Sequence, residues 1–192
     1  MAQETRTGKT IDFLQTGLLL FLGYETLKLF GVIDSKEDKE NAANAARLSA
    51  YRIYTLKDGF LSIARQWEKD NDKKLPKNGA TDILIGAKGI ERAHVIAEMI
   101  HESKKRFNDN EELLYSGFRA MGNIAQLYFM NEWFKKYGEG NIFDYISIFT
   151  NVEQQAQVVQ LMDTKPIYYG GKVIPIGKKK SKLKDKLGRI KR

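Results

Sequence analysis

The chain has 192 residues, 42% of them apolar and 11% aromatic, which places residues 1–177 among globular rather than disordered proteins. It contains no cysteine, which excludes a disulfide framework, a thiol nucleophile and a thiolate metal site. The formal net charge is +8, from 32 Lys and Arg against 24 Asp and Glu.

All of this net charge lies in the last fifteen residues, 178–192. They hold nine bases and one acid, which leaves residues 1–177 with 23 of each sign. The nine bases are Lys178, Lys179, Lys180, Lys182, Lys184, Lys186, Arg189, Lys191 and Arg192. A segment this basic is attracted to phosphates or lipid headgroups. We therefore predict a basic C-terminal tail that binds an anionic partner, with a solvated tail as the alternative.

The tail also has a weak helical pattern. Leu183, Leu187 and Ile190 are spaced i, i+4, i+7, which would place them on one face of a short helix. Gly188 weakens that helix, and so short a helix is marginal when alone in water.

The N-terminal part begins with a polar arm, residues 1–10, followed by the most apolar segment, Ile11–Ile33. Its uncharged stretch, Phe13–Tyr24, would be about 18 Å long as a helix, whereas a hydrocarbon core is about 30 Å thick. This length favours a buried helix or a subunit-interface helix. Insertion in a membrane and a targeting signal remain the alternatives.

Residues 11–163 predict a helical body. The fold class is mainly α, a bundle of about five helices followed by a β-hairpin and the basic tail. A long helical pattern extends from Ser35, the expected N-cap, to about Lys69, and Gly59 is expected to kink or divide it. Ile83–Ile85, in a turn-rich stretch, predicts one short strand or a plug against the core.

Three further helices are expected. Residues 90–107 form an amphipathic pattern whose apolar face comprises Ile90, Ala93, Ile96, Ala97, Ile100 and Phe107. Asn108-Asp109-Asn110 is expected to break the chain and cap a single helix over 111–136, which is apolar nearly all round and suited to the centre of a core or to a subunit interface. Asn141 is expected to cap a last helix that reaches about Met162.

Residues 164–177 predict a β-hairpin. Gly170-Gly171 would form its two-residue turn, with β-branched and aromatic residues on both sides. Pro175 would make the second strand an edge strand. Tyr168 and Tyr169 lie beside the basic tail, which we expect this hairpin to hold in place.

Both histidines belong to the 90–107 helix. His94, Glu98 and His101 are spaced i, i+4, i+7 and could provide three metal ligands. These three residues lie on the side of the helix opposite the apolar face, where a solvated polar stripe is expected in any case. We therefore expect no metal and no cofactor, and keep these three residues as the candidate ligands.

A second pattern overlaps the first. Glu102-Ser103, Ala120-Met121-Gly122 and Gln126-Leu127 resemble the Glu-Ser and Gly-Ala-Met-Gly-Leu-Met-Gln elements of lytic transglycosylases, which have a lysozyme-like helical fold. The resemblance implies that Glu102 is a catalytic acid acting on peptidoglycan. Such an acid needs an apolar pocket that raises its pKa.

Three functions follow. The first is a non-enzymatic structural or assembly protein, such as a connector or minor capsid subunit of a phage virion, whose tail contacts nucleic acid or an acidic subunit. It would form a homo-oligomer or a hetero-complex, in a virion or the cytoplasm. The second is a membrane-associated protein that inserts Ile11–Ile33 and places its tail on anionic lipid. The third is a cell-wall hydrolase that uses Glu102.

Overall fold

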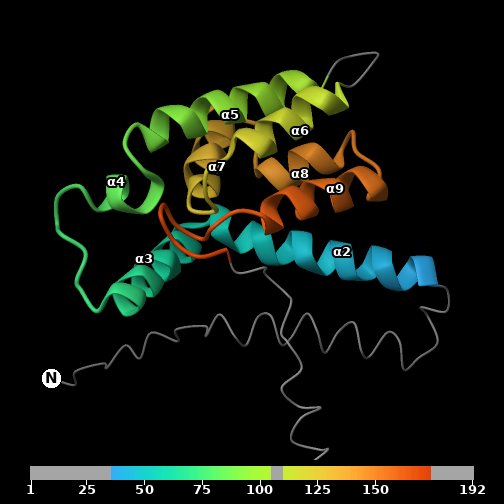
Figure 1. The fold of residues 1–192 in the computed structure, drawn as a ribbon. Coiled ribbons are helices and arrows are strands. Elements are labelled where there is room, and N and C mark those ends of the chain that lie inside the picture. The colour runs from blue at the N-terminus through green and yellow to red at the C-terminus, as the bar shows by residue number, and fades with distance from the viewer. Residues whose placement is uncertain (1–35, 105–109, 174–192) are drawn as a thin grey trace, which may run out of the picture.

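The computed structural model describes residues 36–104 and 110–173, which are mainly helical (Figure 1). Eight α-helices lie in these ranges together with one 3-10 helix, η1. The elements are α2 (Lys36–Arg52), η1 (Ile53–Thr55), α3 (Lys57–Asn71), α4 (Ala80–Ile85), α5 (Gly89–Ser103), α6 (Glu111–Ala120), α7 (Gln126–Lys136), α8 (Ile142–Ser147) and α9 (Val152–Asp163).

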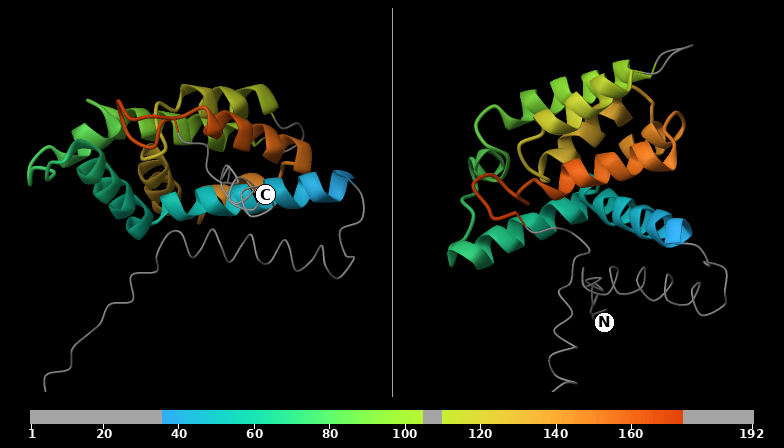
Figure 2. Two further views of the ribbon diagram at one scale, coloured as in Figure 1. Left: turned by 60° about the horizontal axis from the view of Figure 1, so that its bottom comes forward. Right: turned by 45° about the vertical axis from the view of Figure 1, so that its right-hand side comes forward.

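The helices form two layers around one core. Helix α5 packs on α6 and α7, whereas α2 packs on α9 along the opposite side of the molecule (Figures 1 and 2). Helix α7 also contacts η1, and through it the α2–α3 side. The core between the layers is made of fully buried side chains such as Phe118, Leu127, Met130, Phe134 and Ile146.

The predicted pattern from Ser35 to Lys69 is divided, as expected, but the division lies at Ile53–Leu56 rather than at Gly59. Gly59 is in the first turn of α3, where a β-carbon would lie 2.1 Å from the carbonyl oxygen of Ile53. The glycine therefore allows α3 to begin directly against the backbone of η1.

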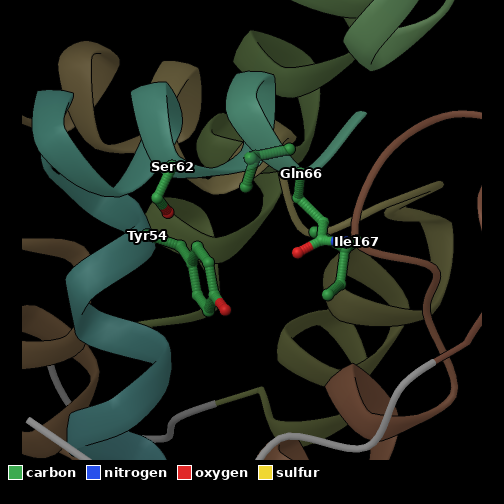
Figure 3. A pocket seen from close by; sticks show the side chains of 5 residues that line it. Tyr54, Ser62, Gln66 and Ile167 are labelled. Carbon is green, nitrogen blue, oxygen red and sulfur yellow. The ribbon is translucent and has the colours of Figure 1, made fainter. Parts of the chain in front are cut away.

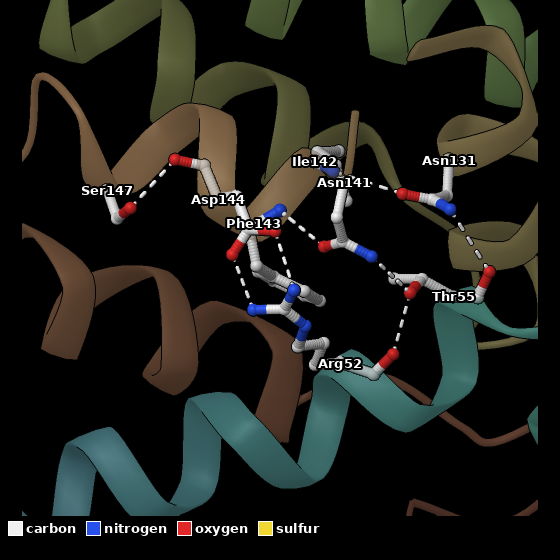
Figure 4. Close-up of polar contacts among 8 residues, drawn as sticks. All are labelled: Arg52, Thr55, Asn131, Asn141, Ile142, Phe143, Asp144 and Ser147. Carbon is white, nitrogen blue, oxygen red and sulfur yellow. Dashed lines mark hydrogen bonds and ion pairs between the residues drawn. The ribbon is translucent and has the colours of Figure 1, made fainter. Parts of the chain in front are cut away.

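A polar network joins η1 to α7 and α8 (Figure 4). The buried Asn131 side chain donates to the Thr55 carbonyl oxygen at 3.3 Å and accepts from the Ile142 backbone N–H at 3.0 Å. Asn141 donates to the Thr55 hydroxyl at 2.8 Å. On the surface beside them, both terminal guanidinium nitrogens of Arg52 bind the Asp144 carboxylate. Since buried amides are satisfied here, the network fixes the angle between the two layers.

The helix predicted over 111–136 is two helices, and that prediction was wrong. Residues 121–125 separate α6 from α7, and the Gln126 side-chain oxygen accepts from the Gly122 backbone N–H at 2.7 Å. The Ile124 and Ala125 N–H groups donate to Pro166 and Ile167, so the break is stabilised from elsewhere in the chain. Asn110 caps α6 as expected, accepting from Leu113 N–H.

The helix predicted from Asn141 to Met162 is also divided, into α8 and α9. Asn141 caps α8 as expected, with its side chain accepting from Phe143 N–H at 2.9 Å. A second start follows at Asn151, which forms a reciprocal capping box with Gln154. Two strong N-caps ten residues apart favour two short helices over one long helix.

The Ile83–Ile85 stretch is part of α4, so the plug was predicted correctly and the strand was not. Leu84 and Ile85 are 1% and 2% exposed. Helix α5 confirms the amphipathic prediction, since Ala93, Ile96, Ala97 and Ile100 are buried, although Ile90 is 39% exposed. Phe107 lies outside the described residues.

The predicted β-hairpin is wrong. Residues 166–173 contain no strand, only an isolated bridge between Pro166 and Val173. The carbonyl oxygens of Pro166 and Ile167 accept from Ile124 and Ala125, and the Tyr169 N–H donates to the Leu84 carbonyl oxygen at 2.8 Å. These backbone groups bind helix ends, and pairing with the residues after Gly171 is limited to the single Pro166–Val173 bridge.

Several predictions fall outside the described residues: the arm 1–10, the Ile11–Ile33 segment, the Ser35 cap and the tail 178–192. Within the described ranges, no helix is long and apolar enough to cross a membrane.

Candidate functional site

Helix α5 presents its candidate residues on the side opposite the core. Glu91, Val95, Glu98 and Glu102 recur at four- and three-residue steps, so they form one stripe along the exposed side of the helix. All four are exposed, and Val95 retains 56% of its surface in contact with solvent. We call these four residues the outer stripe.

The three candidate metal ligands lie on α5 but face different surroundings. His94 and Glu98 are exposed, whereas His101 is partly covered by neighbouring aromatic rings. The structure, where it describes the chain, brings together no group of three or more histidines and carboxylates able to hold a metal ion.

His101 belongs to a cluster at the C-terminal end of α5. Its imidazole stacks on Tyr145 of α8, with ring centroids 5.4 Å apart, and meets Trp133 of α7 edge-on at 5.6 Å. Its Nε2 lies 3.1 Å from the Glu139 carboxylate, and the Tyr145 hydroxyl donates to the His101 carbonyl oxygen at 2.9 Å. This histidine therefore connects α5 to α7 and α8.

The ring contacts continue across the surface. Tyr137 lies 4.3 Å from Trp133, and Phe149 lies 5.7 Å from Tyr145. The Lys104 ammonium group lies 4.9 Å from the centroid of the Tyr145 ring, within cation–π range. The sequence analysis missed this cluster; the available signal was the i, i+4 spacing of Trp133 and Tyr137 at the C-terminal end of α7.

Glu102 and the other residues that resemble lytic transglycosylases do not converge. Glu102 is exposed near the C-terminal end of α5. Gln126 is buried at the opposite end of α5, where its amide donates to the Gly89 carbonyl oxygen at 3.4 Å. Thirteen residues of helix separate Gly89 from Glu102, about 20 Å. Ser103 is buried, and its hydroxyl donates to the Ile100 carbonyl oxygen.

A small cleft lies between α3 and the segment after α9 (Figure 3). It is lined by Tyr54, Ser62, Ile63, Gln66 and Ile167 and has a volume of about 110 Å³. Sites for organic ligands usually have about 300 Å³ or more. Burial, with a smaller contribution from Tyr51, raises the pKa of Tyr54 above its ordinary value, so its hydroxyl stays protonated. Glu102 does not line this cleft.

The residues that lead toward the tail are fixed beside the N-terminus of α5. The Tyr169 ring lies against Gly86, where a β-carbon would meet it at 3.0 Å. The Tyr168 hydroxyl donates to Asp70 at 2.9 Å, and burial is the largest cause of its raised pKa. We call residues 166–169 the mount.

The comparisons with known proteins are uniformly negative. No protein-family model, no curated protein and no solved structure matches this chain.

Proposed function

We propose that this protein is a non-enzymatic assembly subunit whose basic tail, residues 178–192, binds nucleic acid or an acidic partner subunit. A subunit of a large complex such as a phage virion, of the connector or minor capsid type, is the concrete form of the proposal. The observation that carries it is the charge distribution: the tail holds nine bases and one acid, and the rest of the chain has no net charge.

The charges on the helical body support the proposal that the tail, and not the body, binds the anionic partner. Several carboxylates of the body form ion pairs with bases of the body itself: Asp144 with Arg52, Glu112 with Arg119, and Glu132 with Lys135. Surface pairs of this kind contribute little stability, but they leave the body with a mixed charge pattern that attracts no particular ion.

The mount supports the part of the proposal that assigns partner binding to the tail. Main-chain hydrogen bonds from Ile124, Ala125 and Tyr169 fix residues 166–169 to two helix ends. Only eight residues separate Tyr169 from Lys178, so the tail is tethered to the mount by a short length of chain.

A binding experiment with the full chain tests the proposal. Fluorescence anisotropy of a labelled duplex oligonucleotide is measured over a series of salt concentrations. We expect binding that weakens with salt, since each phosphate contact contributes a slope of about 0.9 in log K against log salt. Replacing Lys182, Lys184 and Lys186 by Gln should lower that slope by about 3.

The matched control replaces three exposed lysines of the body, Lys69, Lys73 and Lys77, by Gln. It makes the same change in net charge and should leave the slope unchanged. Equal weakening by both variants would show that net charge alone matters and would contradict the proposal. Flotation with anionic vesicles that persists at high salt would favour the membrane-associated alternative.

A further inference from the structure

The outer stripe of α5 carries charges that the helix itself disfavours. Glu98 and Glu102 are like charges at i, i+4, an arrangement that destabilises a helix by a few tenths of a kcal/mol. Glu102 also lies in the last turn of α5, where the helix dipole disfavours negative charge. This arrangement costs a little stability, and a basic segment docked on the stripe would offset that cost.

These carboxylates have no partner among residues 36–104 and 110–173. None of Glu91, Glu98 and Glu102 has a hydrogen bond or an ion pair there, although Arg92 and His94 flank them on the same helix. Asp163, by contrast, is paired with Arg47 and accepts from the Tyr51 hydroxyl. Val95, at the middle of the stripe, adds an exposed apolar side chain to the unpaired acids.

The tail has the complementary pattern. Leu183, Leu187 and Ile190 share one face if the tail is helical, and that face spans about 10 Å. Lysines and arginines flank it on both sides. The outer stripe extends over eleven residue steps, about 16 Å, with Val95 between carboxylates. An apolar face bordered by bases thus matches an apolar residue bordered by acids.

The mount brings the two segments within reach. Tyr169 lies against Gly86, three residues before α5 begins, and its N–H binds Leu84. The nine steps from Tyr169 to Lys178 span at most about 30 Å when extended. A segment attached at so short a distance has an effective concentration in the millimolar range for a site on the same chain.

We propose that the tail, residues 178–192, docks on the outer stripe of α5 in its own chain when no partner is bound. The inference rests on the proposed function, because the docked tail is the same segment that binds the anionic partner. Docking and partner binding then compete for the same lysines. The stripe acts as an internal substitute for the partner's phosphates and lowers the affinity for weak or short anionic ligands.

Paramagnetic relaxation tests the contact directly. The chain has no cysteine, so Ser181→Cys creates one attachment site for a nitroxide label in the full chain. We expect broadening of the amide signals of residues 91–102 at low salt, and recovery of those signals at high salt. The amide signals of α9, on the other layer, serve as the reference.

Two further samples separate the possible outcomes. In the triple variant Glu91→Gln, Glu98→Gln, Glu102→Gln, the broadening of α5 should disappear. The second sample mixes isotope-labelled chains without nitroxide and unlabelled chains with nitroxide. In this mixture the amide signals of α5 should stay sharp. Broadening of α5 in the mixture would assign the stripe to a second copy and overturn the proposal, as would an unaffected α5 in every sample.

The consequence for binding is measured separately. The triple Gln variant should bind a duplex oligonucleotide about three- to tenfold more tightly than the wild type, because a larger fraction of tails is available. Equal affinities would contradict the competition. If neither protein binds the oligonucleotide, the proposed function fails, whereas the relaxation data still decide whether the tail docks on α5.

Discussion

Gly59 lies against the backbone of Ile53 so closely that any β-carbon at position 59 would lie 2.1 Å from the Ile53 carbonyl oxygen. The first turn of α3 and the 3-10 turn before it therefore touch through main-chain atoms. This contact sets the path of the chain from η1 into α3, and backbone atoms cannot move aside as a flexible side chain can.

Gly59→Ala should therefore be strongly destabilising. We expect a loss of about 3 kcal/mol in the free energy of unfolding, because relief of the overlap requires α3 to shift. Urea denaturation followed by circular dichroism measures it. Gly122→Ala is the matched control: its β-carbon would meet only the Gln126 side-chain oxygen, at 3.5 Å. Its stability should stay within about 1 kcal/mol of the wild type.

Asn131 should contribute more stability than an asparagine cap on the surface. Asn131→Ala leaves the Ile142 N–H and the Thr55 carbonyl oxygen without their buried partner, which should cost about 2–4 kcal/mol. Asn151→Ala removes an exposed cap and should cost about 1 kcal/mol. Similar losses from the two variants, measured by thermal unfolding, would argue against the network in Figure 4.

Stability should fall in alkaline solution, in part through Tyr54. Burial raises the pKa of Tyr54 above its ordinary value of 10.0, so above pH 10 the unfolded chain loses this proton while the folded chain keeps it. The unfolded state is then favoured, by about 1.4 kcal/mol per pH unit for one group. Tyr54→Phe should remove this contribution to the fall of unfolding free energy with pH. The fall is measured from urea denaturation midpoints between pH 8 and 11.

The exposed Tyr137 provides the control for that titration. Tyr137→Phe changes a ring that is 58% exposed and should keep the alkaline slope of the wild type. If Tyr54→Phe also keeps it, the hydroxyl of Tyr54 is not protected by folding.

Hydrogen exchange should detect the mount. The amides of Ile124, Ala125 and Tyr169 donate to carbonyl oxygens at 2.9, 3.0 and 2.8 Å, so they should exchange slowly. The exposed Gly170, next in the chain, should exchange rapidly. Rates for Ile124 and Ala125 as fast as that of Gly170 would mean that residues 166–169 do not hold the α6–α7 turn.

The helix faces could be predicted from the sequence because their causes are local. The spacing of Ala93, Ile96 and Ile100 defines the buried face of α5, and the side chains of Asn110 and Asn141 cap the residues that follow them. Periodicity and capping depend only on neighbours within a turn or two of helix.

The helix breaks and the mount depend on distant partners. Met121 and Ile124 are each 1% exposed, so the apolar pattern continues through the break between α6 and α7. The break is stabilised by carbonyl groups about forty residues later, which no local pattern indicates. Ile167, Tyr168 and Tyr169 have the β-branched and aromatic composition of a strand, but the carbonyl oxygens of Pro166 and Ile167 bind a helix end.

The residues of the candidate site also fall into those that the local sequence predicts and those that depend on distant partners. The solvated stripe of α5 follows from the helical repeat, and Glu98 lies where that repeat places it. His101 was expected on the same stripe, but α8 places Tyr145 over its ring. That contact joins residues forty-four positions apart, which the sequence pattern does not reveal.

The mount also has a consequence for the order in which the molecule forms. Residues 166–169 bind both α4 and the α6–α7 turn. They are synthesised after both of these partners. Until they leave the ribosome, the Ile124 and Ala125 N–H groups have no carbonyl partner, and the start of α7 is incomplete. We therefore expect the body to complete its folding late, when the nascent chain has extended well past Tyr169.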